Sequence, residues 1–182
     1  MNILIVGDSF AAPSNEKYTW YNRLSQKHTI KNIAEAGVGE YKILKQIESQ
    51  LPLEECDRII MVHTSPFRIH THTHPVHKSG SHSNCDLLYA DLEHHASQLV
   101  HTNNRSLYAA LSFIEYHFDI EYYKEIYTLI RNKIKTLTKA KDTIDLCAWD
   151  DGTILHSAYY QHPGKVNHLS EEGHRLVYDH VR

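Results

Sequence analysis

The chain has 182 residues, of which 41% are hydrophobic and 23% charged, and this size and balance suit one globular domain. Nineteen basic and 22 acidic residues give a formal net charge of −3 with neutral histidines, so we expect no binding to nucleic acid or to an anionic membrane. The three cysteines form no CxxC pair and indicate a reducing compartment. The N-terminal apolar run, residues 3–6, is too short for a signal peptide or a membrane span, so we expect a cytoplasmic protein.

Apolar runs and helical spacing predict the elements in chain order. Strands are expected at residues 2–7, 29–33, 58–63 and 143–148. Helices are expected at residues 18–26, 40–51, 87–101, 106–117 and 120–137, and a final helix follows Ser170, a good N-cap, with Glu171 and Glu172 in its first turn. The helix at 120–137 carries an apolar face throughout its length, whereas residues 70–85 and 150–167 are expected to be loops.

Strands alternate with helices along the chain. Alternation of this kind favours a mostly parallel sheet with helices on both faces, which is a three-layer α/β/α sandwich. Neither a repeat nor an interdomain linker is recognisable, so we expect one domain over residues 1–182. Residues 70–117 are expected to form a polar and helical insertion near the active site.

A serine follows the first predicted strand directly, in the sequence Gly7-Asp8-Ser9-Phe10. Open α/β sheets bind ligands at the carboxyl ends of their strands, so a hydroxyl at this position faces the expected site. The turn can also aim backbone N–H groups at a substrate oxygen. A plain turn in which Asp8 or Ser9 caps the next segment explains this short motif equally well.

The sequence NHLSEEGH at 167–174 places a histidine immediately before the final helix. A serine hydroxyl needs an adjacent base to act as a nucleophile, and that base is usually histidine. Because the chain has 16 histidines, one of them alone carries little weight. The position of His168 between a loop and a helix N-terminus favours it as the base, whereas His174 is expected to pack or to cap.

These segments resemble the sequence blocks of the SGNH (GDSL-type) serine hydrolases. GDSF at 7–10 is similar to the first block of the family and NHLSEEGH to the last. NIAEAGVGEYKI at 32–43 is similar to the second block, in which Gly37 matches the glycine that donates an N–H to the oxyanion hole. VHTSP at 62–66 lies where the third block is expected. The blocks occur in the family's order over nearly the whole chain, which is identified as a divergent member.

The resemblance implies the SGNH hydrolase fold with a flavodoxin-like sheet, Ser9 as nucleophile and His168 as its base. It also implies an oxyanion hole that includes the N–H groups of Ser9 and Gly37. Two positions depart from the family. The third block usually supplies an asparagine donor, and the matching residue here is Thr64, whose hydroxyl can donate one hydrogen bond. An aspartate usually lies three residues before the catalytic histidine, and that position is Lys165.

The missing aspartate leaves the orientation of the His168 ring open. A backbone carbonyl could hold the ring, or Asp150 or Asp151 from the preceding loop could do so. Loss of the orienting carboxylate lowers turnover on the order of 10⁴-fold in a well-studied triad, so activity itself is in question. Arg68 could bind an acidic substrate group or form a structural ion pair. The candidate substrate contacts are Asp8, Arg68 and Asn167.

Histidines recur at positions 70, 72, 74, 77 and 82, and Cys85 follows them. Alternating histidines in an extended segment would project imidazoles to one side, which suggests metal binding. The spacing nevertheless matches no zinc signature closely. We interpret the segment 70–82 as a solvated loop near the active-site mouth, and we assign the chain no metal and no cofactor.

The sequence therefore predicts a hydrolase of a small carboxylic ester, for example an O-acetyl group, that works through an acyl-enzyme on Ser9. An acyltransferase would use the same intermediate with a different acceptor. A catalytically silent binding protein would keep the fold, and Lys165 and Thr64 favour that alternative. The expected partner is a small acyl ester, and the sequence determines neither its acyl group and alcohol nor the oligomeric state.

Overall fold

The computed structural model describes residues 1–98, 104–164 and 168–182. These ranges contain one sheet of parallel strands in the order β2-β1-β3-β4. The strands are β1 (Asn2–Gly7), β2 (Thr29–Asn32), β3 (Arg58–His63) and β4 (Asp142–Cys147). Each lies where an apolar run predicted it, to within one residue at either end. The order matches a flavodoxin-like sheet, whose ligands bind beyond the carboxyl ends of β1 and β3.

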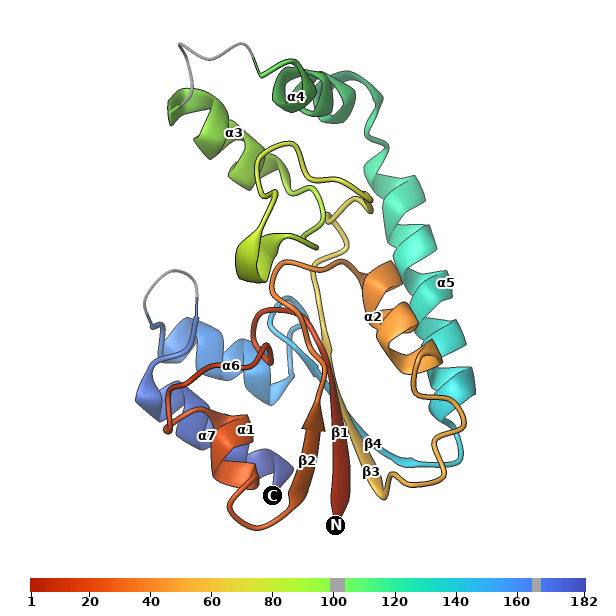
Figure 1. The fold of residues 1–182 in the computed structure, drawn as a ribbon, viewed down its shortest axis with the longest axis vertical. Coiled ribbons are helices and arrows are strands. Elements are labelled where there is room, and N and C mark those ends of the chain that lie inside the picture. The colour runs from red at the N-terminus through yellow and green to blue at the C-terminus, as the bar shows by residue number, and fades with distance from the viewer. Residues whose placement is uncertain (99–103, 165–167) are drawn as a thin grey trace.

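Helices cover both faces of the sheet (Figure 1). One face carries α1 (Trp20–Leu24), α6 (Ile154–Gln161) and α7 (Glu171–Val181), and the other carries α2 (Glu40–Glu48) and α5 (Ile120–Thr138). Successive side chains of a strand point to opposite faces, so Ile3 and Ile5 of β1 lie in one core and Leu4 and Val6 in the other. The three-layer α/β/α arrangement is thereby confirmed.

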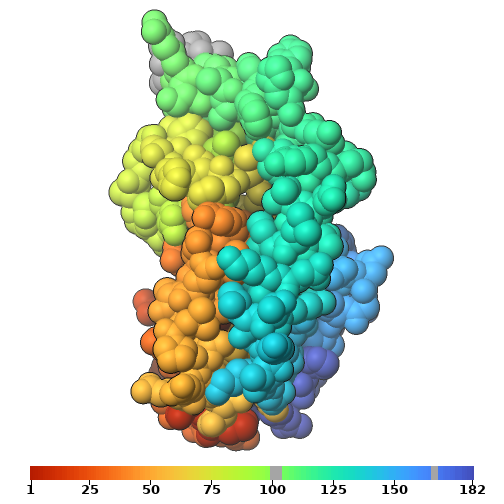
Figure 2. All heavy atoms as spheres, turned by 90° about the vertical axis from the view of Figure 1, so that its right-hand side faces the viewer, coloured from red at the N-terminus to blue at the C-terminus, as the bar shows by residue number. Residues whose placement is uncertain are grey.

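Further helical segments lie beyond the carboxyl ends of the strands. They are η1 (Gly80–His82), α3 (Tyr89–Gln98) and α4 (Arg105–His117), which lie above α2 in Figure 1, and Figure 2 shows α5 beside α2 and continuing upward toward them. α5 reaches into this region, so Ile134 is fully buried whereas Ile120 is 44% exposed. The apolar face predicted for residues 120–137 is therefore a core face only in the second half of the helix. Within the described ranges, no helix has the length and apolar character of a membrane span.

One helix lies in a stretch that was predicted to be a loop. α6 falls inside residues 150–167, where two glycines and a proline indicated irregular structure. The Thr153 hydroxyl caps the helix by accepting a hydrogen bond from the His156 N–H at 3.1 Å. Leu155 and Ala158 are buried in the core beside α7. Such a short helix depends on tertiary packing, which the apolar spacing of eight residues does not reveal.

A buried carboxylate joins the segment after β3 to the start of α2. The Asp86 side chain is fully buried and accepts hydrogen bonds from the N–H groups of Gly39 at 2.6 Å and Thr71 at 2.9 Å. The Lys42 ammonium lies 2.8 Å from the same carboxylate. A buried charge is tolerated when it is paired and hydrogen-bonded, so these contacts hold the segment 70–88 against α2.

A second buried polar group ties α2 to the sheet. The His63 ring at the end of β3 lies between the carboxylates of Glu40, 2.6 Å from Nδ1, and Asp145, 3.3 Å from Nε2. Burial alone would lower the pKa of His63, but the hydrogen bonds with Asp145 and Glu40 outweigh it and raise the pKa above its ordinary value. The contacts therefore join three elements, α2, β3 and β4.

The carboxyl end of β1 approaches β3 very closely at Gly7. The Gly7 backbone has φ +146°, and a Cβ built there would lie 2.6 Å from the Val62 Cβ and closer still to the Val62 carbonyl oxygen. The Gln46 side chain accepts a hydrogen bond from the Gly7 N–H at 2.8 Å and donates one to the Gly7 carbonyl at 3.2 Å. Glycine is required here by both conformation and space.

We predict that Gly7→Ala lowers the free energy of unfolding by about 3 kcal/mol or more, because the added methyl overlaps β3. Urea denaturation followed by circular dichroism measures the change. Gly152→Ala is the control, since Gly152 also has a positive φ of +90° but open space around it. That variant should lose only about 1–2 kcal/mol. Equal losses would show that the close approach to Val62 contributes nothing.

Candidate active site

A cavity of about 910 Å³ lies at the carboxyl edge of the sheet. Four stretches of the chain line it: the segment after β1, the segment after β2, η1, and the loop that leads into α7. Ser9 and His168, which are 159 positions apart, both contribute to its wall. A second cavity, of about 540 Å³, lies at the amino ends of β1 and β2 and contains neither residue.

The turn that carries Ser9 is held by hydrogen bonds on several sides. The Asp8 carboxylate accepts the Phe10 N–H at 3.0 Å, and the Trp20 indole N–H donates to the Phe10 carbonyl at 3.1 Å. The Asn32 side chain donates to the Ala11 carbonyl at 2.8 Å. Ser9 itself is half-buried, and within the described residues its N–H has no acceptor. The turn therefore presents a hydroxyl and an unpaired N–H together.

His168 approaches the turn from the other end of the chain. Its ring lies 5.6 Å from the Phe10 ring, centroid to centroid, and its carbonyl accepts the Gly164 N–H at 2.6 Å. Burial lowers the pKa of His168, while the charge of Glu16 opposes this and that of His82 adds to it. The ring is therefore neutral near pH 7, as a general base must be. No hydrogen bond joins it to Ser9 among the described residues.

Gly37 occupies a tight turn after β2. It has φ +75°, and a Cβ there would lie 2.6 Å from the Cys85 Cβ. Its carbonyl accepts hydrogen bonds from the Arg68 guanidinium at 3.1 Å and from the Asp86 N–H at 2.9 Å. The Gly37 N–H has no acceptor in the described part of the chain. Its neighbour Ala36 lines the cavity. The second free backbone donor thus lies beside the cavity.

The structure does not bring Thr64, Asp8 or Arg68 into the cavity lining. Thr64 is fully buried, and its hydroxyl accepts a hydrogen bond from the Arg68 Nε at 3.0 Å. Burial raises the pKa of Asp8 to about 6, although Arg68, the Phe10 N–H and Thr64 all act to lower it. These side chains join the turns after β1, β2 and β3, so the substrate contacts expected of Asp8 and Arg68 find no support.

The two aspartates considered as orienters of His168 have other partners. Asp150 pairs with Arg131 at 3.1 Å, and Asp151 pairs with His156 at 2.9 Å. Neither has a contact with the His168 ring among the described residues. Lys165 and Asn167, the latter a predicted substrate contact, lie outside the residues that the structure describes.

The sequence analysis missed Glu16, which lines the cavity and whose charge acts on His168. Glu16 lies in an irregular segment between β1 and α1, outside every family block, so no sequence signal singles it out. His174 also lines the cavity, and its Nδ1 accepts the Trp20 N–H at 3.5 Å. Burial lowers the pKa of His174 to about 4, so this second ring is neutral near pH 7, and it packs against the Tyr18 ring with centroids 5.6 Å apart.

Two groups of residues in the described chain could hold a metal ion, and neither includes Ser9 or His168. They are His74 with His77 and Cys85, and His77 with Asp91 and His95. Both lie in or beside the histidine-rich segment. Neither group contributes a residue to the lining of the cavity.

No protein-family model matches the sequence, and no curated protein is significantly similar to it. Solved structures similar to this chain include the psychrotrophic esterase EstA from a Pseudoalteromonas species, at 14% identity and a TM-score of 0.45, covering 98% of this chain and 92% of that one. A member of the lipolytic protein G-D-S-L family from Veillonella parvula has 14% identity and a TM-score of 0.40, covering 98% and 94%. The lipase/acylhydrolase from Enterococcus faecalis has 13% identity and a TM-score of 0.41, covering 98% and 91%.

The Veillonella parvula protein carries in its name the G-D-S-L motif of the family that the sequence blocks resemble, and the other two are named as an esterase and a lipase/acylhydrolase. Their identities and TM-scores are low, so we base the proposed function on the residues of the site and not on the neighbours.

We predict that Asp8 makes stability fall as pH rises from about 4 to about 6.5. Its pKa is raised in the folded state, so the folded protein holds a proton that the unfolded chain, with an ordinary aspartate pKa of ~3.9, releases. The contribution reaches about 3 kcal/mol across this range. Urea denaturation at several pH values measures it, and Asp8→Asn should lack it. An identical pH dependence in both proteins would contradict the assignment.

Proposed function

We propose that this chain is a serine hydrolase of the SGNH type that cleaves a small carboxylic ester, for example an O-acetyl group. The observation that carries the proposal is the common cavity of Ser9 and His168, which come from opposite ends of the sequence. A volume of about 910 Å³ is in the range of small-molecule sites. Nucleophilic catalysis by a serine requires a base in the same cavity, and the shared cavity supports the resemblance in this respect.

In the proposed reaction, His168 takes the proton from the Ser9 hydroxyl as Oγ attacks the ester carbonyl carbon. The N–H groups of Ser9 and Gly37 stabilise the negative oxygen of the tetrahedral intermediate. The bond to the alcohol then breaks, and His168 returns the proton to the leaving oxygen. Water, activated in the same way, releases the acid from Ser9. No hydrogen bond joins the Ser9 hydroxyl to the His168 ring among the described residues, so the two groups must first come into contact.

The oxyanion donors in this proposal are both backbone groups. They are favoured because neither N–H has an acceptor among the described residues, whereas the Thr64 hydroxyl is buried and accepts a hydrogen bond from Arg68. Thr64 then holds Arg68 against the Gly37 carbonyl and so supports the turn at Gly37 indirectly.

We further propose that residues 70–117 form an insertion near the active site within the single domain. Ser81 and His82 support this proposal because they bring the segment to the cavity wall.

A catalytically silent binding protein is the second candidate. It is favoured by the pairing of Asp150 with Arg131 and of Asp151 with His156, because no carboxylate among the described residues then forms a hydrogen bond with the His168 ring. An acyltransferase would use the same acyl-enzyme and transfer its acyl group to an acceptor other than water. Adding small alcohols to the ester assay and comparing the rate of acyl transfer with the rate of hydrolysis distinguishes the acyltransferase from the hydrolase.

We expect a fluorophosphonate probe to label wild-type protein at Ser9, as located by peptide mass spectrometry, and to leave Ser9→Ala unlabelled. Hydrolysis of p-nitrophenyl acetate should fall at least about 10³-fold in Ser9→Ala and in His168→Gln. Ser81→Ala removes another hydroxyl from the cavity wall and should retain activity. Absence of labelling at every pH from about 6 to 9, a range that spans the ordinary histidine pKa of ~6.5, would favour the binding protein.

The labelling rate should also report the titration of His168. Because burial lowers the pKa of this ring, the neutral base persists to lower pH, and the rate should decline only below the ordinary histidine value of ~6.5. Asp8 titrates in the same region, so the profile is repeated with Asp8→Asn. If the decline disappears in that variant, it belongs to Asp8 and not to the base.

A further inference from the structure

The histidine-rich segment folds so that imidazoles gather around the carboxylate of Asp91. The His77 Nε2 lies 3.2 Å from Asp91 Oδ2, and the His95 Nε2 lies 3.5 Å from Asp91 Oδ1. The His74 Nε2 lies 3.6 Å from Oδ2. The side chains of His77, Asp91 and His95 are 25%, 35% and 20% exposed, so solvent and ions can reach them.

Two different elements supply these groups. Asp91 and His95 are four residues apart on α3, so they lie one turn apart on the same helix face. His77 comes from the segment between β3 and η1 and meets them across the space between the two elements. α3 therefore supplies two of the three candidate metal-binding side chains, and the segment between β3 and η1 supplies the third.

The separations of the donor atoms fit a tetrahedral metal ion. Zn²⁺ binds nitrogen and oxygen at about 2.0–2.2 Å, and two ligands of a tetrahedron at that distance are about 3.3–3.6 Å apart. The His77–Asp91 and His95–Asp91 separations of 3.2 and 3.5 Å, which end on different oxygens of the carboxylate, are close to this spacing, and one ligand atom from each of the three residues lies within 4.8 Å of the others. We propose that His77, Asp91 and His95 bind one Zn²⁺ ion, with water in the fourth position.

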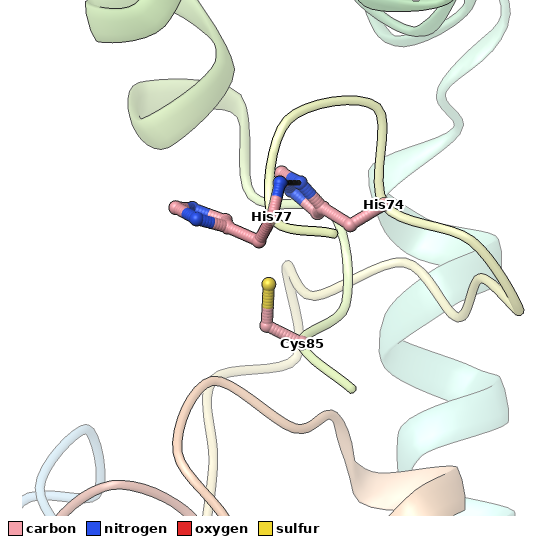
Figure 3. A group of neighbouring side chains, drawn as sticks. All are labelled: His74, His77 and Cys85. Carbon is pink, nitrogen blue, oxygen red and sulfur yellow. Dashed lines mark hydrogen bonds between the residues drawn. The ribbon is translucent and has the colours of Figure 1, made fainter. Parts of the chain in front are cut away.

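His74 is a positioning residue in this proposal. Its Nδ1 accepts the N–H groups of Val76 at 3.2 Å and His77 at 3.1 Å, so the proton of the ring is on Nε2 (the His77 contact is the dashed line in Figure 3). The Nε2–H is buried, has no hydrogen-bond partner within 3.5 Å in the described residues, and faces the Asp91 carboxylate. It can orient that carboxylate toward the ion, as groups behind metal ligands do.

Cys85 offers an alternative set with His74 and His77. Figure 3 shows its sulfur directed toward the two histidines. That set is weaker because the His74 Nδ1 already accepts two backbone N–H groups, and its Nε2 carries the proton. Only the His77 ring and the Cys85 sulfur would remain free to bind the ion, so the set of His77, Asp91 and His95, the carboxylate set, is favoured. A thiolate ligand would have a distinct spectroscopic signature, which makes the two sets separable.

The proposed ion would join the segment around His77 to α3. The same segment continues into Ser81 and His82, which line the large cavity. Metal binding would therefore stabilise one wall of that cavity without touching Ser9 or His168. The inference is independent of the proposed ester hydrolysis, because its ligands contribute nothing to the proposed reaction.

Titration calorimetry of chelator-treated protein with Zn²⁺ tests the proposal. We expect a single strong equivalent per chain, and an affinity at least about 100-fold lower in His77→Gln, Asp91→Asn and His95→Gln. His94→Gln is the matched control, since it removes the neighbouring histidine of α3 and should bind like wild type. Circular dichroism verifies that each variant is folded. Binding by the ligand variants that equals the control would overturn the site.

Co²⁺ substitution tests the identity of the ligands. The proposed nitrogen and oxygen set predicts visible bands of tetrahedral Co²⁺ without a thiolate-to-cobalt charge-transfer band. The spectrum should be unchanged in Cys85→Ser. A charge-transfer band that Cys85→Ser removes would overturn the carboxylate set in favour of the cysteine set.

Discussion

The geometry of the cavity depends on how closely β1 can approach β3 at Gly7. The Gly7 backbone lies against Val62, and the Gln46 amide satisfies both the N–H and the carbonyl of Gly7. Buried backbone groups need such partners, and a side chain that supplies both also fixes the direction in which the strand ends. The turn that follows then places Asp8 inside the protein and Ser9 at the cavity. A change at this contact would move Ser9 before it altered any residue of the cavity itself.

The sequence reveals the sheet well, because buried parallel strands are continuous apolar runs. The segments 2–7 and 58–63 were predicted with their observed bounds, and the Ser170 cap was recognised from its residue type and the acidic residues after it. The helix at 154–161 was not recognised, since packing rather than spacing stabilises it. α5 was predicted almost to the residue, yet half of its apolar face lies beyond the sheet. Sequence periodicity defines a helix face but not how far the neighbouring layer extends.

The candidate site also combines features that the sequence predicts with features that it does not. Ser9, Gly37 and His168 belong to segments whose order along the chain is recognisable, and the cavity brings Ser9 and His168 together. The contacts of Asp150 and Asp151 could not be predicted, because each depends on a basic side chain or a ring that a helix supplies, and the contact of Thr64 with Arg68 depends on the conformation of the segment after β3 that carries both residues. Likewise, the alternation of histidines at 70, 72 and 74 does not indicate which carboxylate each ring meets. His70 lies 3.3 Å from Asp86 and His74 lies 3.6 Å from Asp91, and the phase of α3 places His95 beside Asp91 as well.

The walls of the cavity are attached to the protein by different means. Ser9 and His168 are held through the layer of α1, α6 and α7, where Phe10, Trp20 and His174 pack together. The wall formed by Ser81 and His82 belongs to the segment that Asp86 fastens to α2, on the opposite side of the sheet. Insertions or deletions in that segment would change the shape of the space offered to a ligand while Ser9 and His168 kept their positions. Such a division allows the shape of the cavity to diversify separately from this pair of residues.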